Sequence, residues 1–196
     1  MSLRVLGVDP GLTRCGYGVL DAGRGRGASL VDVGVVRSAP EDTIDLRLLA
    51  ISRGLEAKLE EHAPDVVAIE RVFSQNNTST VMGTAQVSGV AILLAAQRGI
   101  RIAMHTPSEV KAAVTGSGRA DKKQIQTVLV KILGLSEAPR PADAADAIAI
   151  ALTQLWRGPG PVRLDATGGA RTSAQSRWAE AERAARRARE SSTSRF

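Results

Sequence analysis

The order of apolar and polar residues near the N-terminus predicts three strands joined by short turns. An apolar run, Leu3–Val8, ends at the turn residues Asp9-Pro10-Gly11. A second run covers Gly16–Leu20, and a third covers Ser29–Arg37 after the Gly- and Arg-rich residues 23–27. Because short turns join antiparallel neighbours, we expect an antiparallel meander in this part of the chain.

After the meander the period of the apolar residues lengthens, which predicts a helix over roughly residues 43–62. The nearly continuous apolar run Asp65–Glu70 is typical of a buried parallel strand. A polar loop, residues 74–78, leads into a long helix ending near Gly99, and Ile100–His105 reads as a fifth strand.

Three more helices are predicted before residue 158. Thr106-Pro107-Ser108-Glu109 combines a capping box with proline at the first helical position. The Gly-rich linker Thr115–Arg119 precedes a helix whose apolar side includes Ile125 and Leu129, and a last helix runs from Asp143 to about Trp156. A meander followed by alternating helices and strands predicts an α/β fold with a mixed five-stranded sheet flanked by helices.

The composition argues against a membrane-spanning, secreted or disulfide-rich protein and does not narrow the class further. No apolar run approaches the ~20 residues that span a bilayer, and the N-terminus has no signal-peptide pattern. The single cysteine, Cys15, excludes an internal disulfide framework, and we expect a small packed residue in a cytoplasmic protein.

Positive charge is concentrated at the C-terminal end. The formal net charge is +6, and residues 157–196 hold nine arginines against four acidic residues. We therefore predict a folded domain over residues 1–157 and a basic, flexible tail over residues 158–196 that begins at a Gly-Pro breaker. The tail is expected to bind phosphates, and an inert solubilising extension is the alternative.

Four carboxylates form the candidate site. Asp9 and Glu70 each follow an apolar run and so stand at the C-terminal end of a predicted strand, where ligand sites of open sheets lie. Asp143 and Asp146 are three residues apart and share one face of the last helix. Oxygen-only ligands suit Mg²⁺ or Mn²⁺, and two such ions ~3.5–4 Å apart promote phosphodiester hydrolysis.

Each of these acids also has a simpler interpretation when it is taken alone. Asp9 before Pro-Gly is typical of a turn, and Glu70 could be an ordinary exposed acid. Asp143 and Asp146 could cap the last helix and complement its dipole. Three separate elements would bring these acids to one edge of the sheet, and this joint placement favours the metal site over the simpler interpretations.

Three motifs resemble those of the RuvC family and occur in that family's order. Gly7-Val8-Asp9-Pro10-Gly11 with Gly16-Tyr17-Gly18 is similar to its opening hairpin. Ala68–Phe73 resembles its second motif and Ala142–Ala147 its last, so that the likeness covers residues 4 to about 155. The first helical residue of the last motif varies between Asp and His in the family, and here it is Asp143.

The resemblance implies a ribonuclease H-like fold and a homodimer. It implies a Mg²⁺-dependent endonuclease, with two ions per active site, that resolves four-way (Holliday) junctions in DNA recombination and repair. The paired cuts would leave 5′-phosphate and 3′-hydroxyl ends, within a short thymine-containing consensus. A branch-migration helicase complex is the expected partner.

Further residues are candidates for DNA contact. Lys111 and Lys122 match positions where the family has basic residues near the scissile phosphate, and a solvated helix face is the alternative for both. Phe73, on a polar loop after Glu70, is expected to stack on a base, with a core position as the alternative. Gly83 and Gly89 would permit close helix packing, either within the subunit or at a dimer interface.

Three other functions compete with junction resolution. An ATP-binding kinase or actin-like protein opens with a similar phosphate-binding hairpin, but this chain lacks a second lobe and a Gly-rich adenosine motif. A related nuclease acting on RNA or on another DNA form would use the same metals. A non-catalytic junction-binding module would have no need of the intact acidic set.

Overall fold

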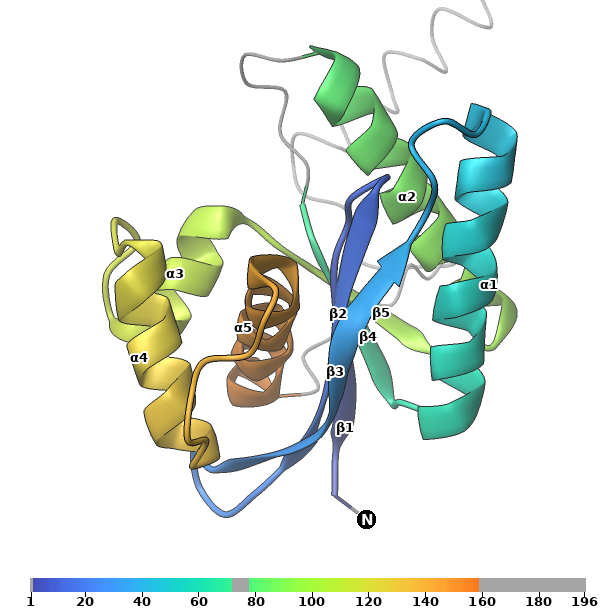
Figure 1. Cartoon of the computed structure of the whole chain (residues 1–196). Coiled ribbons are helices and arrows are strands. Elements are labelled where there is room, and N and C mark those ends of the chain that lie inside the picture. The colour runs from blue at the N-terminus through green and yellow to red at the C-terminus, as the bar shows by residue number, and fades with distance from the viewer. Residues whose placement is uncertain (1, 72–77, 159–196) are drawn as a thin grey trace, which may run out of the picture. The chain divides into compact units, whose positions relative to one another are not determined.

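One mixed sheet with the strand order β3-β2-β1-β4-β5 organises the part of the chain that the structure, a computed structural model, describes, residues 2–71 and 78–158 (Figure 1). The elements are β1 (Arg4–Asp9), β2 (Arg14–Ala22), β3 (Ala28–Arg37), α1 (Ile44–His62), β4 (Val66–Glu70), α2 (Thr78–Gln97), β5 (Arg101–His105), α3 (Pro107–Thr115), α4 (Lys122–Leu133) and α5 (Ala142–Arg157).

The predicted antiparallel meander and the predicted parallel strand over residues 65–70 are confirmed. β1, β2 and β3 form an antiparallel meander, while β4 pairs with β1 in parallel and β5 pairs with β4 in parallel. Thr106 caps α3 as the sequence predicts: its side chain accepts a hydrogen bond from the Glu109 amide, and a Glu109 carboxylate oxygen accepts one from the Thr106 amide at 2.7 Å. A second capping box, formed by Asp121 and Gln124 at the start of α4, went unnoticed in the sequence.

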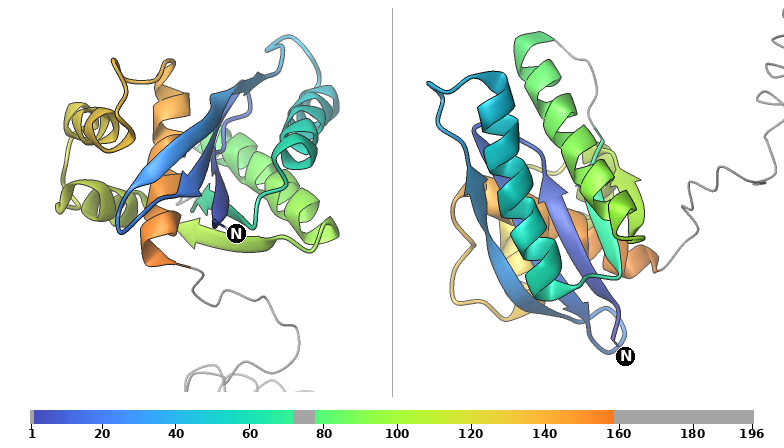
Figure 2. Two further views of the ribbon diagram at one scale, coloured as in Figure 1. Left: turned by 90° about the horizontal axis from the view of Figure 1, so that it is seen from below. Right: turned by 90° about the vertical axis from the view of Figure 1, so that its right-hand side faces the viewer.

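Helices cover both faces of the sheet (Figures 1 and 2). α1 and α2 pack over one face, where Leu6 and Val8 of β1 are buried. α5 lies against the other face, with α3 and α4 outside it, and Val5 of β1 belongs to that second core. No described helix is long and apolar enough to cross a membrane.

Glycines allow α5 to lie directly on β1 and β2. A methyl group at Gly7 would collide with the Ala147 carbonyl oxygen, and one at Gly16 with the Asp143 carbonyl oxygen. At Gly18 it would lie 2.7 Å from Ile148 Cγ1. The missing side chains bring the backbone of α5 against the strands, and its first turn therefore lies over Gly16, the register partner of Asp9.

We expect Gly7→Ala to destabilise the protein by roughly 1–3 kcal/mol or more, because α5 would have to move away from β1. Gly118→Ala is the matched control, since its added methyl group would meet the Ser108 carbonyl oxygen at an ordinary 3.4 Å. Urea unfolding at equilibrium measures both changes. Equal stabilities for the two variants would show that α5 does not depend on this close approach.

Candidate active site

The predicted strand ends deliver Asp9 and Glu70 to one edge and one face of the sheet. β1 ends at Asp9 and β4 at Glu70, and the parallel register pairs the residues just before them, Val8 and Ile69. Side chains alternate between faces along a strand, and Val8 and Ile69 face the core of α1 and α2. Asp9 and Glu70 therefore lie on the α5 face, and both are partly buried.

The first turns of α5 supply the other two acids. The side chains of Asp143 and Asp146 are 24% and 33% exposed. Neither caps the helix: Pro141 occupies the N-cap position, and no side-chain cap hydrogen bond is formed there. The capping part of the alternative is therefore wrong for both acids, whereas Asp143 does lie in the first turn of α5, where an acid complements the helix dipole. Asp9 pairs with Gly16 in the β1–β2 ladder, so that it is part of the strand rather than of the turn.

Electrostatic coupling ties the four carboxylates together. Burial raises the pKa of Asp9 to about 7, and the charges of Glu70, Asp146 and Asp143 add to this increase. Burial and the charge of Asp146 also raise the pKa of Glu70. The site therefore holds more negative charge than the surrounding protein neutralises.

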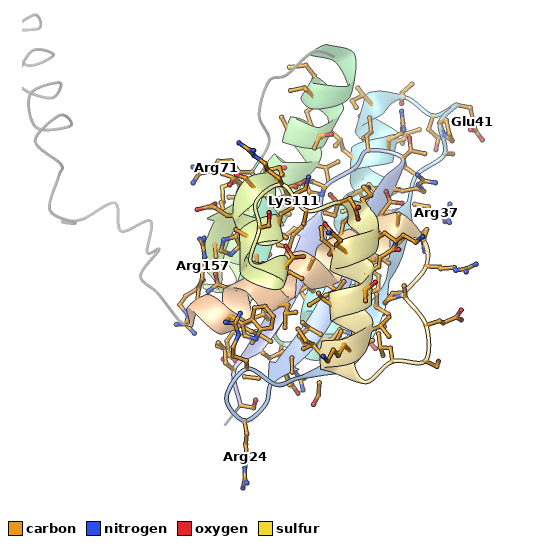
Figure 3. The ribbon with its side chains drawn as sticks, turned by 90° about the vertical axis from the view of Figure 1, so that its left-hand side faces the viewer. Arg24, Arg37, Glu41, Arg71, Lys111 and Arg157 are labelled. Atoms are coloured by element: carbon orange, nitrogen blue, oxygen red, sulfur yellow. The ribbon has the colours of Figure 1, made fainter. Side chains whose placement is uncertain are left out.

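Two lysines face this negative charge. Lys122, the first residue of α4, donates a hydrogen bond from Nζ to Asp146 Oδ2 at 3.1 Å, which raises the lysine's pKa. Lys111 projects from α3 (Figure 3), and its charge opposes the rise in the pKa of Glu70. Both lysines line a cleft of about 230 Å³ together with Glu70 and Asp146. The predicted basic residues thus lie beside the predicted acids.

Arg14 is a site residue that the sequence reasoning missed. Its Nε lies 3.0 Å from Asp143 Oδ2, although without hydrogen-bond geometry. That oxygen is buried and accepts no hydrogen bond from any described residue. The sequence could have indicated this position. Arg14 and Gly16 are two residues apart in one strand, so that both face the side of the sheet on which α5 lies.

The donor set fits hard divalent cations. All four side chains offer carboxylate oxygens, and the buried Asp143 Oδ2 still lacks a hydrogen-bond donor. No three of the four bring ligand oxygens within 4.8 Å of one another in the described structure. Like charges repel one another, so that a divalent cation among these carboxylates would favour a closer approach.

A different trio, Asp32, Glu61 and His62, does satisfy that distance among the described residues. Lys58 Nζ lies 2.9 Å from Asp32 Oδ2 and 2.8 Å from Glu61 Oε2, so that a side-chain cation already occupies this cluster. The trio is a salt-bridge network between α1 and β3 and does not resemble an open metal site.

Comparison with known proteins identifies the family. Residues 5–154 match the family model described as "Crossover junction endodeoxyribonuclease RuvC". The chain belongs to the RuvC family. The RuvC protein of Saccharopolyspora erythraea is 61% identical over 162 residues, which cover 83% of this chain and 81% of that protein. That of Paenarthrobacter aurescens is 57% identical over 96% of this chain and 100% of its own length. The chain is accordingly a crossover junction endodeoxyribonuclease.

Solved structures agree with this membership. Thermus thermophilus RuvC in complex with a Holliday junction substrate is 32% identical, with a TM-score of 0.76 over 79% of this chain and 94% of that one. The yeast mitochondrial Holliday junction resolvase Ydc2 shares the fold alone, at 14% identity and a TM-score of 0.57 over 79% of each chain. The predicted ribonuclease H-like fold is confirmed.

The remaining sequence predictions have different outcomes. Gly83 packs within the subunit, where an added methyl group would lie 3.2 Å from Leu12 Cδ2, whereas Gly89 faces open space. Cys15 is buried in β2, as expected. Phe73 lies outside the described residues, and its stacking role stays a prediction.

The raised pKa of Asp9 makes the stability of the metal-free protein depend on pH. The folded-state pKa of about 7 exceeds the ordinary value of 3.8, so that ionisation opposes folding. The penalty grows between about pH 4 and pH 7 and is constant above that range. Asp9→Asn lacks it and should be more stable than the wild type by roughly 2–4 kcal/mol at pH 8 in EDTA.

Thermal melting from pH 4 to pH 8 measures this difference, which should shrink toward zero at the acid end. Adding Mg²⁺ at pH 8 should stabilise the wild type and leave Asp9→Asn almost unchanged, because a ligand that binds only the folded state raises its stability. A difference independent of pH would contradict the raised pKa of Asp9.

Proposed function

We propose that this protein resolves four-way DNA junctions by paired, Mg²⁺-dependent phosphodiester hydrolysis, and that Asp9, Glu70, Asp143 and Asp146 hold the metal ions. The observation that carries the proposal is the convergence of these acids from β1, β4 and α5, with coupled charges and two lysines beside them. The products are 5′-phosphate and 3′-hydroxyl ends.

The carboxylates position and neutralise the metal centre. When bound, two divalent ions supply Lewis-acid stabilisation of the scissile phosphate and lower the pKa of the attacking water. Asp9 and Glu70, fixed at the ends of adjacent strands, hold the centre rigidly, whereas Asp143 and Asp146 close it from α5. Four acids offset most of the charge of two divalent ions and still permit an anionic phosphate to approach.

The lysines bind the substrate phosphate. In the metal-free arrangement Lys122 Nζ pairs with Asp146 Oδ2 at 3.1 Å. With cations bound at the acids, the Lys122 ammonium group would be free to bind a phosphate oxygen, and Lys111 lines the same cleft from α3. Mn²⁺ satisfies the same oxygen ligands and should replace Mg²⁺.

The substrate is inferred from the family. The Thermus thermophilus relative was solved with a Holliday junction, and this chain aligns with nearly all of it. Two symmetric cuts across a junction require two active sites. A two-fold homodimer supplies them.

An exposed face of α2 is the candidate dimer surface. Met82 and Leu93 are 61% and 57% exposed, which is unusual for large apolar side chains on a helix of a soluble domain. Gly89 lies between them with open space beside its Cα. Spacings of seven and four residues place all three on one side of α2, where a second copy of the helix can approach closely.

Leu93→Glu should convert the dimer to a monomer, because two charges would be buried at the two-fold contact. Sedimentation velocity measures the change, and Val31→Glu, at a 40% exposed position on β3, is the matched control. Monomers should nick junctions singly instead of making paired cuts. A Leu93→Glu protein that still sediments as a dimer would exclude this face as the interface.

Three expectations concern parts that the structure does not describe or partners it does not contain. Base stacking by Phe73 and phosphate binding by the tail, residues 158–196, stay predictions, since apart from Gly158 these residues lie outside the described ranges. A branch-migration helicase complex remains the predicted partner, with no surface assigned to it.

Replacing either strand-end acid tests the proposed activity. Asp9→Asn and Glu70→Gln should each lower junction cleavage in Mg²⁺ by at least about a hundredfold, because a primary metal ligand is lost. Junction binding should stay within several-fold of the wild type. Cleavage at a tenth of the normal rate would mean that the altered residue is not a primary ligand.

The substrate is tested in the same assay with junction, linear duplex and RNA–DNA hybrid. Only the junction should be cut in opposed strands, and ligation of the nicked products should report 5′-phosphate and 3′-hydroxyl ends. Preferential cutting of the hybrid would instead indicate a nuclease that acts on RNA.

A further inference from the structure

A second cleft lies on the other side of the active-site acids from the lysines. It has a volume of about 370 Å³ and is lined by residues from β2, the turn before it, α1, α2 and α5: Gly11, Leu12, Thr13, Arg14, Arg47, Gly83, Thr84 and Asp143. Its charged side chains are two arginines and one aspartate, so that it carries a net positive charge next to the carboxylates.

Arg47 is held firmly but has no acidic partner. Its Nε donates a hydrogen bond to Ser38 Oγ at 3.1 Å, and its Nη2 donates one to Thr13 Oγ1 at 2.7 Å. Ser38 Oγ in turn donates to the Leu12 carbonyl oxygen at 2.6 Å, which fixes the hydroxyl that receives the guanidinium. No carboxylate of the described residues forms an ion pair with Arg47, which is itself partly buried.

A guanidinium that lines a cleft without a carboxylate partner can bind an anion there. Structural salt bridges elsewhere in the protein show the contrast, since Arg4 pairs with Asp21 at 2.7 Å and Arg98 with Glu56 at 2.7 Å. Arg47 instead presents the rest of its planar guanidinium to a cleft, the arrangement that suits bidentate binding of a phosphate.

Arg14 connects this cleft to the active site. Its side chain is 52% exposed, and its Nε lies 3.0 Å from Asp143 Oδ2. Asp143 lines the arginine cleft, whereas Asp146, one helical turn further along α5, lines the lysine cleft. The two clefts therefore adjoin across the first turns of α5.

We propose that the arginine cleft binds a phosphodiester group of the strand being cut, next to the scissile one and on the opposite side from Lys111 and Lys122. Arg47 is the fixed donor, and Arg14 joins it when Asp143 binds a cation. The strand is thereby gripped on both sides of the metal centre. This subsite rests on the proposed nuclease function, because it takes the same DNA strand.

Junction binding at several salt concentrations tests the subsite. Fluorescence anisotropy is measured in Mg²⁺ in a Glu70→Gln background, with and without Arg47→Gln or Arg14→Gln. Loss of a charge-assisted phosphate contact should weaken binding by roughly tenfold at low salt. The slope of log affinity against log salt should flatten by about 0.9 for Arg47→Gln.

Two further variants test whether the effect depends on a positive charge at position 47. Arg47→Lys keeps the charge and should restore most of the salt slope. Arg24→Gln removes an exposed arginine from the β2–β3 turn, at the opposite end of the molecule from Lys111 (Figure 3), and should change neither quantity. Thermal melting checks that each variant is folded at the assay temperature.

The outcomes separate this proposal from the function on which it rests. An Arg47→Gln protein with an unchanged salt slope would overturn the subsite and leave Arg47 as a structural tie between Ser38 and Thr13. A wild-type protein that neither binds nor cuts junctions would instead overturn the proposed function. Flattened slopes for the glutamine variants, with junction cleavage intact in the wild type, would support both.

Discussion

The close contact between α5 and the strands β1 and β2 is the constraint on which the active site depends. Gly7, Gly16 and Gly18 provide a surface without side chains, and the helix backbone lies on it directly. Any larger residue would lift α5 and carry Asp143 and Asp146 away from the strand ends. The close contact of α5 with β1 and β2 thus determines both the packing of the core and the spacing of the carboxylates.

Electrostatics then determines what this arrangement can do. Four carboxylates in a partly buried site repel one another, and the protein offsets only part of their charge through Lys122 on Asp146 and Arg14 on Asp143. The side chains of Lys122 and Arg14 are 72% and 52% exposed, so that both could move away if metal ions took their place beside the carboxylates. The fold therefore holds a cluster of like charges, which the divalent cations of the proposed function would neutralise.

The strands, the acids at their ends and the start of α3 could be predicted from the sequence, because each depends on residues that are close together in the chain. Apolar runs that end in an acid specify both a strand and the position of its last side chain, as at Asp9 and Glu70. The capping box at Thr106 could be recognised from the sequence as the start of a helix. The box at Asp121 lies among charged residues and was not predicted.

Arg14 and Arg47 could not be assigned in the same way, because their roles depend on contacts between distant elements. Arg47 meets Thr13 across 34 positions, and Arg14 meets the first turn of α5. Gly83 and Gly89 likewise look equivalent in the sequence, and only tertiary packing separates the buried glycine from the exposed one.

The most direct test of the central claim is a crystal structure of the protein soaked in Mn²⁺, with the ions located by anomalous scattering. We expect anomalous peaks among Asp9, Glu70, Asp143 and Asp146, with Lys122 and Arg14 displaced from their carboxylates. Peaks confined to other acidic clusters, such as Asp32, Glu61 and His62, with none among these four, would contradict the assignment of the active site.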